Sequence, residues 1–165
     1  MSKFERSTAR AAFALTALAL AACGSSTEPE VEYEVIEETT FDPSLGVDLS
    51  AMTRTASGVY FTDLEEGTGD PAVFGTTLTV TYTGWLTDGT QFQEGTYTFL
   101  MGNNLVILGW EDGLLGTKEG GTRLVVIPPN RAYGGQARYD EFGNEIIPAG
   151  SVLVFRLTLD SVAGG

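Results

Sequence analysis

Aromatic side chains are the residues of this chain whose type and spacing best suit a chemical role. Trp110 lies in the apolar run VILGWEDG at residues 106–113, and Tyr82 and Tyr133 carry hydroxyl groups that need polar partners in an apolar setting. The neighbours of Trp110 are consistent with either ordinary core packing or the floor of a binding cleft. The sequence around the indole does not choose between them.

The missing residue types narrow the chemistry further. The 165 residues include no histidine, so the usual general base and the commonest zinc ligand are absent. The single cysteine, Cys23, lies upstream of the predicted folded domain, which removes thiol catalysis and an intrachain disulfide. We therefore expect no metal and no cofactor. Carboxylates, hydroxyls, aromatic rings, arginines and backbone amides remain.

The charge of the chain excludes one class of partner. Asp and Glu number 22 against 9 Lys and Arg, which gives a formal net charge of −13. Such a protein repels the phosphate backbone, so nucleic acid is not an expected partner.

The first 22 residues have the features of an export signal. Lys3, Arg6 and Arg10 precede an uncharged apolar run at residues 11–22, which is too short to span a bilayer as a helix. Cys23 completes the sequence LAAC, which resembles a bacterial lipobox. We predict a lipoprotein signal peptide at residues 1–22 and lipidation of Cys23; the alternative is an ordinary signal peptide with an incidental cysteine. The lipid would anchor the protein to the membrane in the cell envelope, outside the cytoplasm. In a Gram-negative host this predicts an outer-membrane anchor facing the periplasm.

Residues 23–50 differ in composition from the remainder. Between residues 24 and 50 the chain carries acidic residues and no Lys or Arg. Self-repulsion and low apolar content predict an extended tether. The alternation of Val31, Tyr33 and Val35 leaves a short edge strand as the alternative. The folded domain is then expected at residues 51–165.

The pattern of this domain is mainly that of short strands. Residues 58–63, 77–83, 121–127 and 151–159 are rich in β-branched and aromatic residues, and the last of these alternates apolar and other residues with period two. One helix is predicted at about residues 104–115, capped by Asn103 or Asn104 and ended by Gly116. The fold class is therefore α+β, a twisted antiparallel sheet around one short helix.

Four ordered motifs then give a family resemblance. They are VTYTGWLTDGTQF at 80–92, FLMGNNLVILGWEDG at 99–113, IPPNRAYG at 127–134 and IIPAGSVLVF at 146–155. Together they resemble the FKBP-type peptidyl-prolyl isomerase domain over residues 58–162. The resemblance implies the fold above, wrapped around an aromatic cleft that binds proline-containing polypeptides. It also implies a macrolide as a second kind of ligand.

The resemblance assigns roles to individual residues. Trp110 matches the floor on which the proline ring lies, and Ile107 supplies an amide that binds a ligand carbonyl beside Val106. Tyr133 donates its hydroxyl to another ligand carbonyl, and Ile147 matches a substrate-binding position. The remaining wall positions are matched by Tyr82, Phe92, Tyr97, Phe99 and Phe155. Taken alone, Phe99 and Phe155 would be core residues more often than pocket residues. Trp85 is expected at the surface or the rim.

The reaction implied by this cleft needs no nucleophile, base or metal. Rotation about an X–Pro amide is opposed by a barrier of about 18–20 kcal/mol. A twisted amide is less dipolar than a planar one, so an apolar pocket with well-placed donors lowers the barrier. Two alternatives remain open: a binding or chaperone module with little turnover, and an envelope lipoprotein whose pocket is vestigial.

Two departures from the family pattern bear on these alternatives. The family usually has an aspartate after the phenylalanine matched by Phe92, and this chain has Gln93, whose amide oxygen could still accept a bond from the strand tyrosine. The loop at residues 136–145 is somewhat longer than in the smallest family members. Tyr139 and Phe142 in that loop could either contact substrate or pack the loop down.

Overall fold

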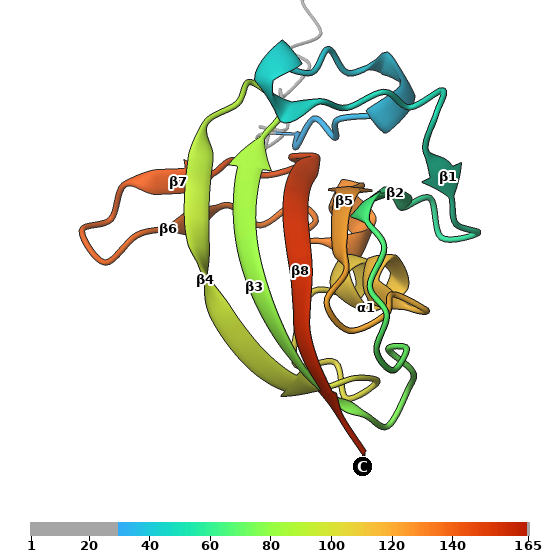
Figure 1. The fold of residues 1–165 in the computed structure, drawn as a ribbon. Coiled ribbons are helices and arrows are strands. Elements are labelled where there is room, and N and C mark those ends of the chain that lie inside the picture. The colour runs from blue at the N-terminus through green and yellow to red at the C-terminus, as the bar shows by residue number, and fades with distance from the viewer. Residues whose placement is uncertain (1–29, 165) are drawn as a thin grey trace, which may run out of the picture. The chain divides into compact units, whose positions relative to one another are not determined.

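A computed structural model describes residues 30–164, and every strand and helix lies in the unit that begins at Val31. The unit is built on a six-stranded antiparallel sheet with the order β1-β2-β5-β8-β3-β4 (Figure 1). A separate hairpin, β6–β7, follows β5 in the chain. The strands are β1 Thr53–Arg54, β2 Tyr60–Glu65, β3 Thr77–Leu86, β4 Gln91–Leu100, β5 Thr122–Ile127, β6 Arg138–Tyr139, β7 Glu145–Ile147 and β8 Leu153–Ala163. The helices are α1 Leu108–Leu114 and the 3-10 turns η1 Ile36–Glu38, η2 Pro43–Leu45 and η3 Pro129–Arg131.

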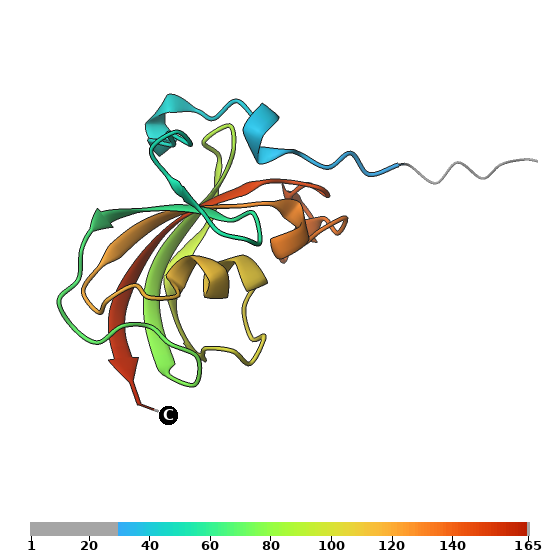
Figure 2. The ribbon, with the colours of Figure 1, turned by 90° about the vertical axis from the view of Figure 1, so that its right-hand side faces the viewer.

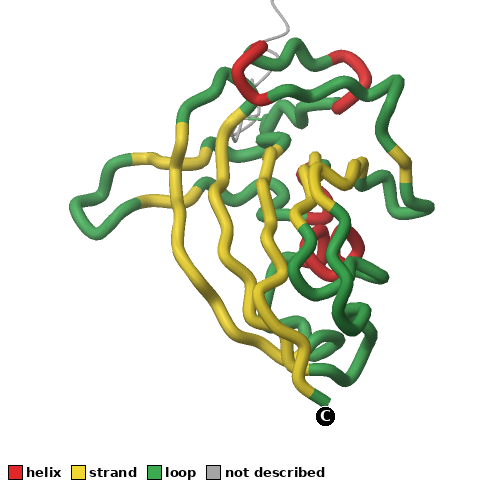
Figure 3. The backbone as a smooth tube through the Cα atoms, viewed as in Figure 1, coloured by secondary structure: helices red, strands yellow, loops and turns green. Residues whose placement is uncertain are grey.

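The alternation along β8 divides the sheet into two faces. Leu153, Phe155, Leu157 and Leu159 are buried with the helix on the inner face. Val152 and Val154 belong to a second buried cluster on the outer face. Because successive side chains of a strand point to opposite faces, both sides of this sheet are covered near β8. The predicted antiparallel α+β fold is confirmed, with one short α-helix among the described residues. Figure 3 shows the strands in yellow and α1, with the 3-10 turns, in red.

Helix α1 lies against the inner face because two of its residues lack side chains (Figure 2). A Cβ at Gly109 would lie 2.2 Å from Ile127 Cγ2, and one at Gly113 would lie 2.7 Å from Val125 Cγ1. Both distances are far shorter than ordinary van der Waals contact, so only glycine permits this approach to β5. Arg123 holds the far end of the helix, since its Nη1 donates to the Gly113 carbonyl at 2.7 Å. The helix axis is thus fixed close to the sheet.

The predicted start of the helix was wrong. Residues 104–107 are not helical: Asn104 is left-handed with φ +54°, and Ile107 has φ −59° and ψ 141°. The Ile107 position precedes the first helical residue, and no side chain caps the helix there. Residues 104–107 therefore form a non-helical segment before the helix, called the rim below. Gly116, the predicted stop, is left-handed with φ +78°, just beyond the last helical residue.

The predicted tether was also wrong where the structure describes it. Residues 31–52, called the strap below, run across the end of the sheet where β8 begins (Figure 1). Ile36 and Leu45 are only 3% and 7% exposed, and they pack against Tyr60, Leu124 and Val154. Burial of these apolar side chains outweighs the repulsion among carboxylates, which stay at the surface. The alternative edge strand does not form at residues 31–35 either.

The predicted signal peptide, Cys23 and the residues up to 29 lie outside the described part of the chain. Within residues 30–164, no helix is both long enough and apolar enough to cross a bilayer.

Candidate active site

A cavity of about 660 Å³ opens beside the start of α1. Its walls come from β3, β4 and β8 of the sheet, from the rim at residues 104–107, and from the segment that leads into the β6–β7 hairpin. The lining residues are Tyr82, Gln93, Tyr97, Asn104, Leu105, Val106, Ile107, Leu108, Trp110, Ala132, Tyr133, Arg138 and Phe155.

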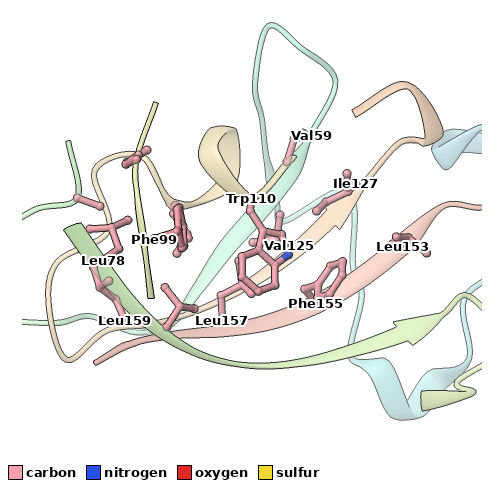
Figure 4. Close-up of a cluster of buried hydrophobic side chains, with 14 of the residues drawn as sticks. Val59, Leu78, Phe99, Trp110, Val125, Ile127, Leu153, Phe155, Leu157 and Leu159 are labelled. Carbon is pink, nitrogen blue, oxygen red and sulfur yellow. The ribbon is translucent and has the colours of Figure 1, made fainter. Parts of the chain in front are cut away.

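Trp110 has the largest side chain among the residues that line this cavity. Its ring contacts Tyr82 with 4.9 Å between centroids and Phe155 with 5.5 Å, both edge to face. Phe99 lies on its other side at 6.2 Å, so the indole is held between Phe99 and Phe155 (Figure 4). Such pairs add roughly 0.5–1.5 kcal/mol each beyond area burial. The indole is thus a rigid surface rather than a mobile side chain.

One further glycine shapes the aromatic wall. A Cβ at Gly84 would lie 2.6 Å from Phe155 Cε1 and 2.7 Å from Phe92 Cζ. The two phenylalanines meet over this glycine, edge to face with 5.6 Å between centroids. Phe92 therefore sets the position of Phe155 from behind the cavity wall.

The cavity contains hydrogen-bond donors that have no protein acceptor. Neither the Tyr82 hydroxyl nor the Tyr133 hydroxyl makes a hydrogen bond within residues 30–164, and the same holds for the Ile107 amide. Burial, and to a lesser degree the neighbouring Tyr133, raises the pKa of Tyr82 above its ordinary value of 10.0. Tyr82 therefore stays protonated at neutral pH. These groups can donate to carbonyl oxygens of a bound chain.

Gln93 lines the cavity but does not support Tyr82. Among the described hydrogen bonds none joins the Gln93 amide to the Tyr82 hydroxyl, although the sequence allowed such a bond. The Gln93 side chain is exposed on β4, where Gln93 pairs with Gly84 of β3. Tyr82 is therefore held by ring packing alone.

Polar contacts fix the rim and the Tyr133 segment to the helix. Glu111 is buried at 6% exposure and accepts a bond from the Gly102 amide at 3.0 Å, which ties the loop before the rim to α1. Asp112 accepts from Arg131 Nε at 2.8 Å, and Arg131 ends η3 two residues before Tyr133. Both carboxylates thus position the site without entering it.

The match to known proteins covers this whole arrangement. Residues 69–160 match the family FKBP-type peptidyl-prolyl cis-trans isomerase. An FK506-binding protein of Neisseria meningitidis serogroup B is 38% identical over 107 residues, which cover 62% of this chain and 94% of the relative.

The chain belongs to the FKBP-type peptidyl-prolyl cis-trans isomerase family.

Solved structures agree with this FKBP assignment. The crystal structure of AtFKBP13 superposes with a TM-score of 0.62 at 32% identity, covering 68% of this chain and 98% of that one. A peptidyl-prolyl cis-trans isomerase of Pseudomonas syringae gives a TM-score of 0.61 at 28% identity, covering 73% and 90%. FkpA from Escherichia coli gives 0.58 at 32% identity, covering 68% of this chain and 52% of FkpA. Members of this family are peptidyl-prolyl isomerases, and the FKBP domain here is an enzyme of that class.

The structure brings most of the predicted site residues of the FKBP domain to the cavity. Eight line it: Tyr82, Gln93, Tyr97, Val106, Ile107, Trp110, Tyr133 and Phe155. Three lie behind the wall instead: Phe92 against Phe155, Phe99 against Trp110, and Ile147 in the inner core at 3% exposure. Trp85 lies away from the cavity and packs with the outer cluster.

The two loop residues left open by the sequence are exposed in the structure. Tyr139 and Phe142 are 59% and 81% exposed, and neither lines the cavity or packs into the core. Arg138, next to Tyr139, also lines the cavity, although the sequence did not predict it as a site residue. The same holds for Asn104, Leu105, Leu108 and Ala132. For Arg138, the only signal in the sequence was its position directly before Tyr139 in the long loop.

Proposed function

We propose that this protein rotates X–Pro bonds of exported polypeptides in the cavity floored by Trp110. The observation that carries the proposal is the combination of a rigid aromatic surface with unpaired donors around it. The proline ring of a substrate lies against the Trp110 indole, with Tyr82 and Phe155 at its sides. The residue before proline then lies toward the rim formed by Val106 and Ile107.

The proposed mechanism is desolvation with selective support of the twisted amide. The planar X–Pro amide loses hydration when it enters an apolar cavity, and the twisted amide loses less because it is less dipolar. The Ile107 amide and the Tyr133 hydroxyl hold the carbonyls that flank the bond in the twisted geometry. No covalent bond breaks, so a site built from aromatic rings and neutral donors is sufficient.

This proposal is tested by measuring how fast the wild type and the Trp110→Ala variant isomerise a short X–Pro peptide. We expect kcat/KM to fall by at least about tenfold, equivalent to roughly 1.4 kcal/mol of transition-state binding. Trp85→Ala is the matched control, since it removes an indole of the outer cluster away from the cavity. Denaturant unfolding of both variants separates loss of the site from loss of the fold. Equal rates for wild type and Trp110→Ala would remove the proposed site.

The alternative is a binding or chaperone module that holds proline segments with little turnover. The missing bond between Gln93 and Tyr82 favours it, because a less ordered tyrosine supports the twisted state less well. Titration of Trp110 fluorescence with a proline peptide, or with a macrolide of the FK506 type, measures binding directly. Saturable binding without measurable isomerisation would favour this alternative, and neither binding nor turnover would favour a vestigial pocket.

We further propose that the mature protein is a lipoprotein anchored through Cys23 in the cell envelope. The support is the basic start, the apolar run at residues 11–22 and the lipobox-like LAAC. Metabolic labelling with a radioactive fatty acid in a bacterial host tests it. Labelled protein in the membrane fraction is expected for the wild type and not for Cys23→Ser; equal labelling of both would contradict the anchor.

A further inference from the structure

The proposed active site differs in charge from the rest of the protein. The whole chain has a formal net charge of −13. Of the described residues that line the cavity, Arg138 alone carries a formal charge, and it is positive. A substrate that reaches the cavity therefore meets a local charge opposite to that of the protein as a whole.

The position of Arg138 is fixed by its surroundings. Arg138 pairs with Ile147 in the β6–β7 hairpin, and Ile147 is buried in the inner core at 3% exposure. The guanidinium carbon lies 4.8 Å from the centroid of the Tyr133 ring, within the range of a cation–π contact. Stacking on Tyr133 holds the guanidinium at the cavity wall, beside a hydroxyl that we assign to substrate binding.

The charge of Arg138 is not neutralised by the described residues. The four ion pairs among residues 30–164 use Arg54, Lys118, Arg123 and Arg131. Arg138 is in none of them, and no hydrogen bond from its guanidinium is present there.

Two carboxylates of the β6–β7 hairpin and two of helix α1 accept hydrogen bonds from other groups. Glu145 accepts from the Tyr139 hydroxyl at 3.4 Å, and Asp140 accepts from the Asn144 side chain at 2.8 Å. On the helix side, Glu111 and Asp112 bind the Gly102 amide and Arg131. Gln93 stands where the family usually has an aspartate, and Glu94, the one carboxylate of β4, does not line the cavity, so β4 places no anion there.

We propose that Arg138 determines substrate specificity, making the cavity favour X–Pro segments that carry an acidic side chain next to the proline. This inference rests on the proposed isomerase function and adds a substrate class to it. Arg138 is exposed, so the pair with a substrate carboxylate is worth the modest amount of a surface ion pair. We expect a preference of about two- to fivefold, which weakens as salt shortens the screening length.

The test compares peptides that differ only in Glu or Gln beside the proline, placed on either side of it. The measured quantity is the ratio of kcat/KM for the Glu peptide to that for the Gln peptide, which cancels any general loss of activity. Arg138→Gln is expected to lower this ratio by about two- to fivefold, and Arg138→Lys to retain part of it. High salt should reduce the wild-type ratio toward that of Arg138→Gln.

Arg156→Gln is the matched control. Arg156 is exposed and stacks on Trp85 at 5.6 Å, away from the cavity, so it makes the same change in net charge. A ratio unchanged by Arg138→Gln on both sides of the proline would overturn the inference. So would an equal fall with Arg156→Gln, because the effect would then belong to the net charge. Turnover of the Gln peptide reports separately on the isomerase function; without it, both proposals fail.

Discussion

The two faces of the sheet are buried by different elements. On the inner face, α1 covers the strands but leaves a cavity of about 660 Å³ floored by Trp110. On the outer face, the strap at residues 31–52 covers Tyr60, Leu124 and Val154 with Ile36 and Leu45. The outer cluster includes Trp85, and this indole stays away from the cavity.

This difference indicates that the inner face serves the site and the outer face serves the stability of the fold. Side chains on the inner face meet over glycines at 84, 109 and 113, so their positions are narrowly set. Side chains of the strap reach the sheet from short 3-10 turns, and the strap contributes no residue to the cavity lining. We therefore expect changes on the outer face to affect stability and changes on the inner face to affect turnover.

The largest expected effect is on the outer face. Ile36→Ala removes a side chain that is only 3% exposed, and such deletions cost about 2–5 kcal/mol of unfolding free energy. Denaturant unfolding measures this loss, while kcat/KM of the folded enzyme should stay within about twofold.

Val35→Ala is the control for this variant, because Val35 lies next to Ile36 in the strap but its side chain is 47% exposed. It should change stability by less than about 0.5 kcal/mol. An Ile36→Ala protein that lost activity but not stability would show that the strap serves the site.

The next effect is on the inner face. Gly84→Ala places a methyl group 2.6 Å from Phe155 Cε1, and overpacking of this kind costs about 1–3 kcal/mol. Relief requires the Phe92 and Phe155 rings to move, which changes the cavity wall. We expect kcat/KM in a peptide assay to fall by about tenfold.

Gly164→Ala is the control for Gly84→Ala, since a Cβ at Gly164 meets nothing within 4 Å. If Gly84→Ala lowered stability and left turnover unchanged, the aromatic wall would not be part of the site.

Sequence patterns predicted the inner face well because its signals are local. The period-two alternation of Leu153, Phe155 and Leu157 places them on one face without any knowledge of the fold. The aromatic wall came from the four motifs rather than from periodicity. Phe99 illustrates the remaining limit: the motif places it at the site, but only the packing places it behind Trp110.

The outer face was missed for a physical reason. Ile36, Phe41 and Leu45 have neither a helical nor a strand spacing over a useful length, because 3-10 turns and extended segments alternate in the strap. The many acidic residues of this segment therefore led to the prediction of an extended tether. The helix start was predicted too early because the apolar pattern begins at Leu105. The left-handed conformation of Asn104, which the sequence pattern does not reveal, is not helical.

A smaller effect on turnover is expected from a change at Gln93, which lines the cavity on the inner face. Gln93→Asp gives Tyr82 a charged acceptor, and hydrogen bonds to a carboxylate are stronger than those to an amide. We expect a better ordered Tyr82 and a rise in kcat/KM of about two- to fivefold, an amount below about 1 kcal/mol. Gln91→Asp, on the same strand but outside the cavity lining, controls for the added charge. A fall in rate specific to Gln93→Asp would contradict this account of the departure from the family pattern.

The smallest effect concerns the pH dependence of the strap. The Tyr60 hydroxyl donates to Glu37 Oε1 at 2.7 Å and, as the main cause, lowers the pKa of Glu37 below its ordinary value of 4.5. A lowered pKa in the folded state stabilises the fold above pH 4.5, and this contribution is lost as pH falls through the lowered value. Because the Glu37 side chain is 50% exposed, solvent screening keeps the contribution below about 1 kcal/mol. Denaturant unfolding of wild type and Glu37→Gln should therefore differ slightly at neutral pH and converge in acid. Turnover of a neutral peptide at neutral pH should be the same for both proteins, because Glu37 does not line the cavity.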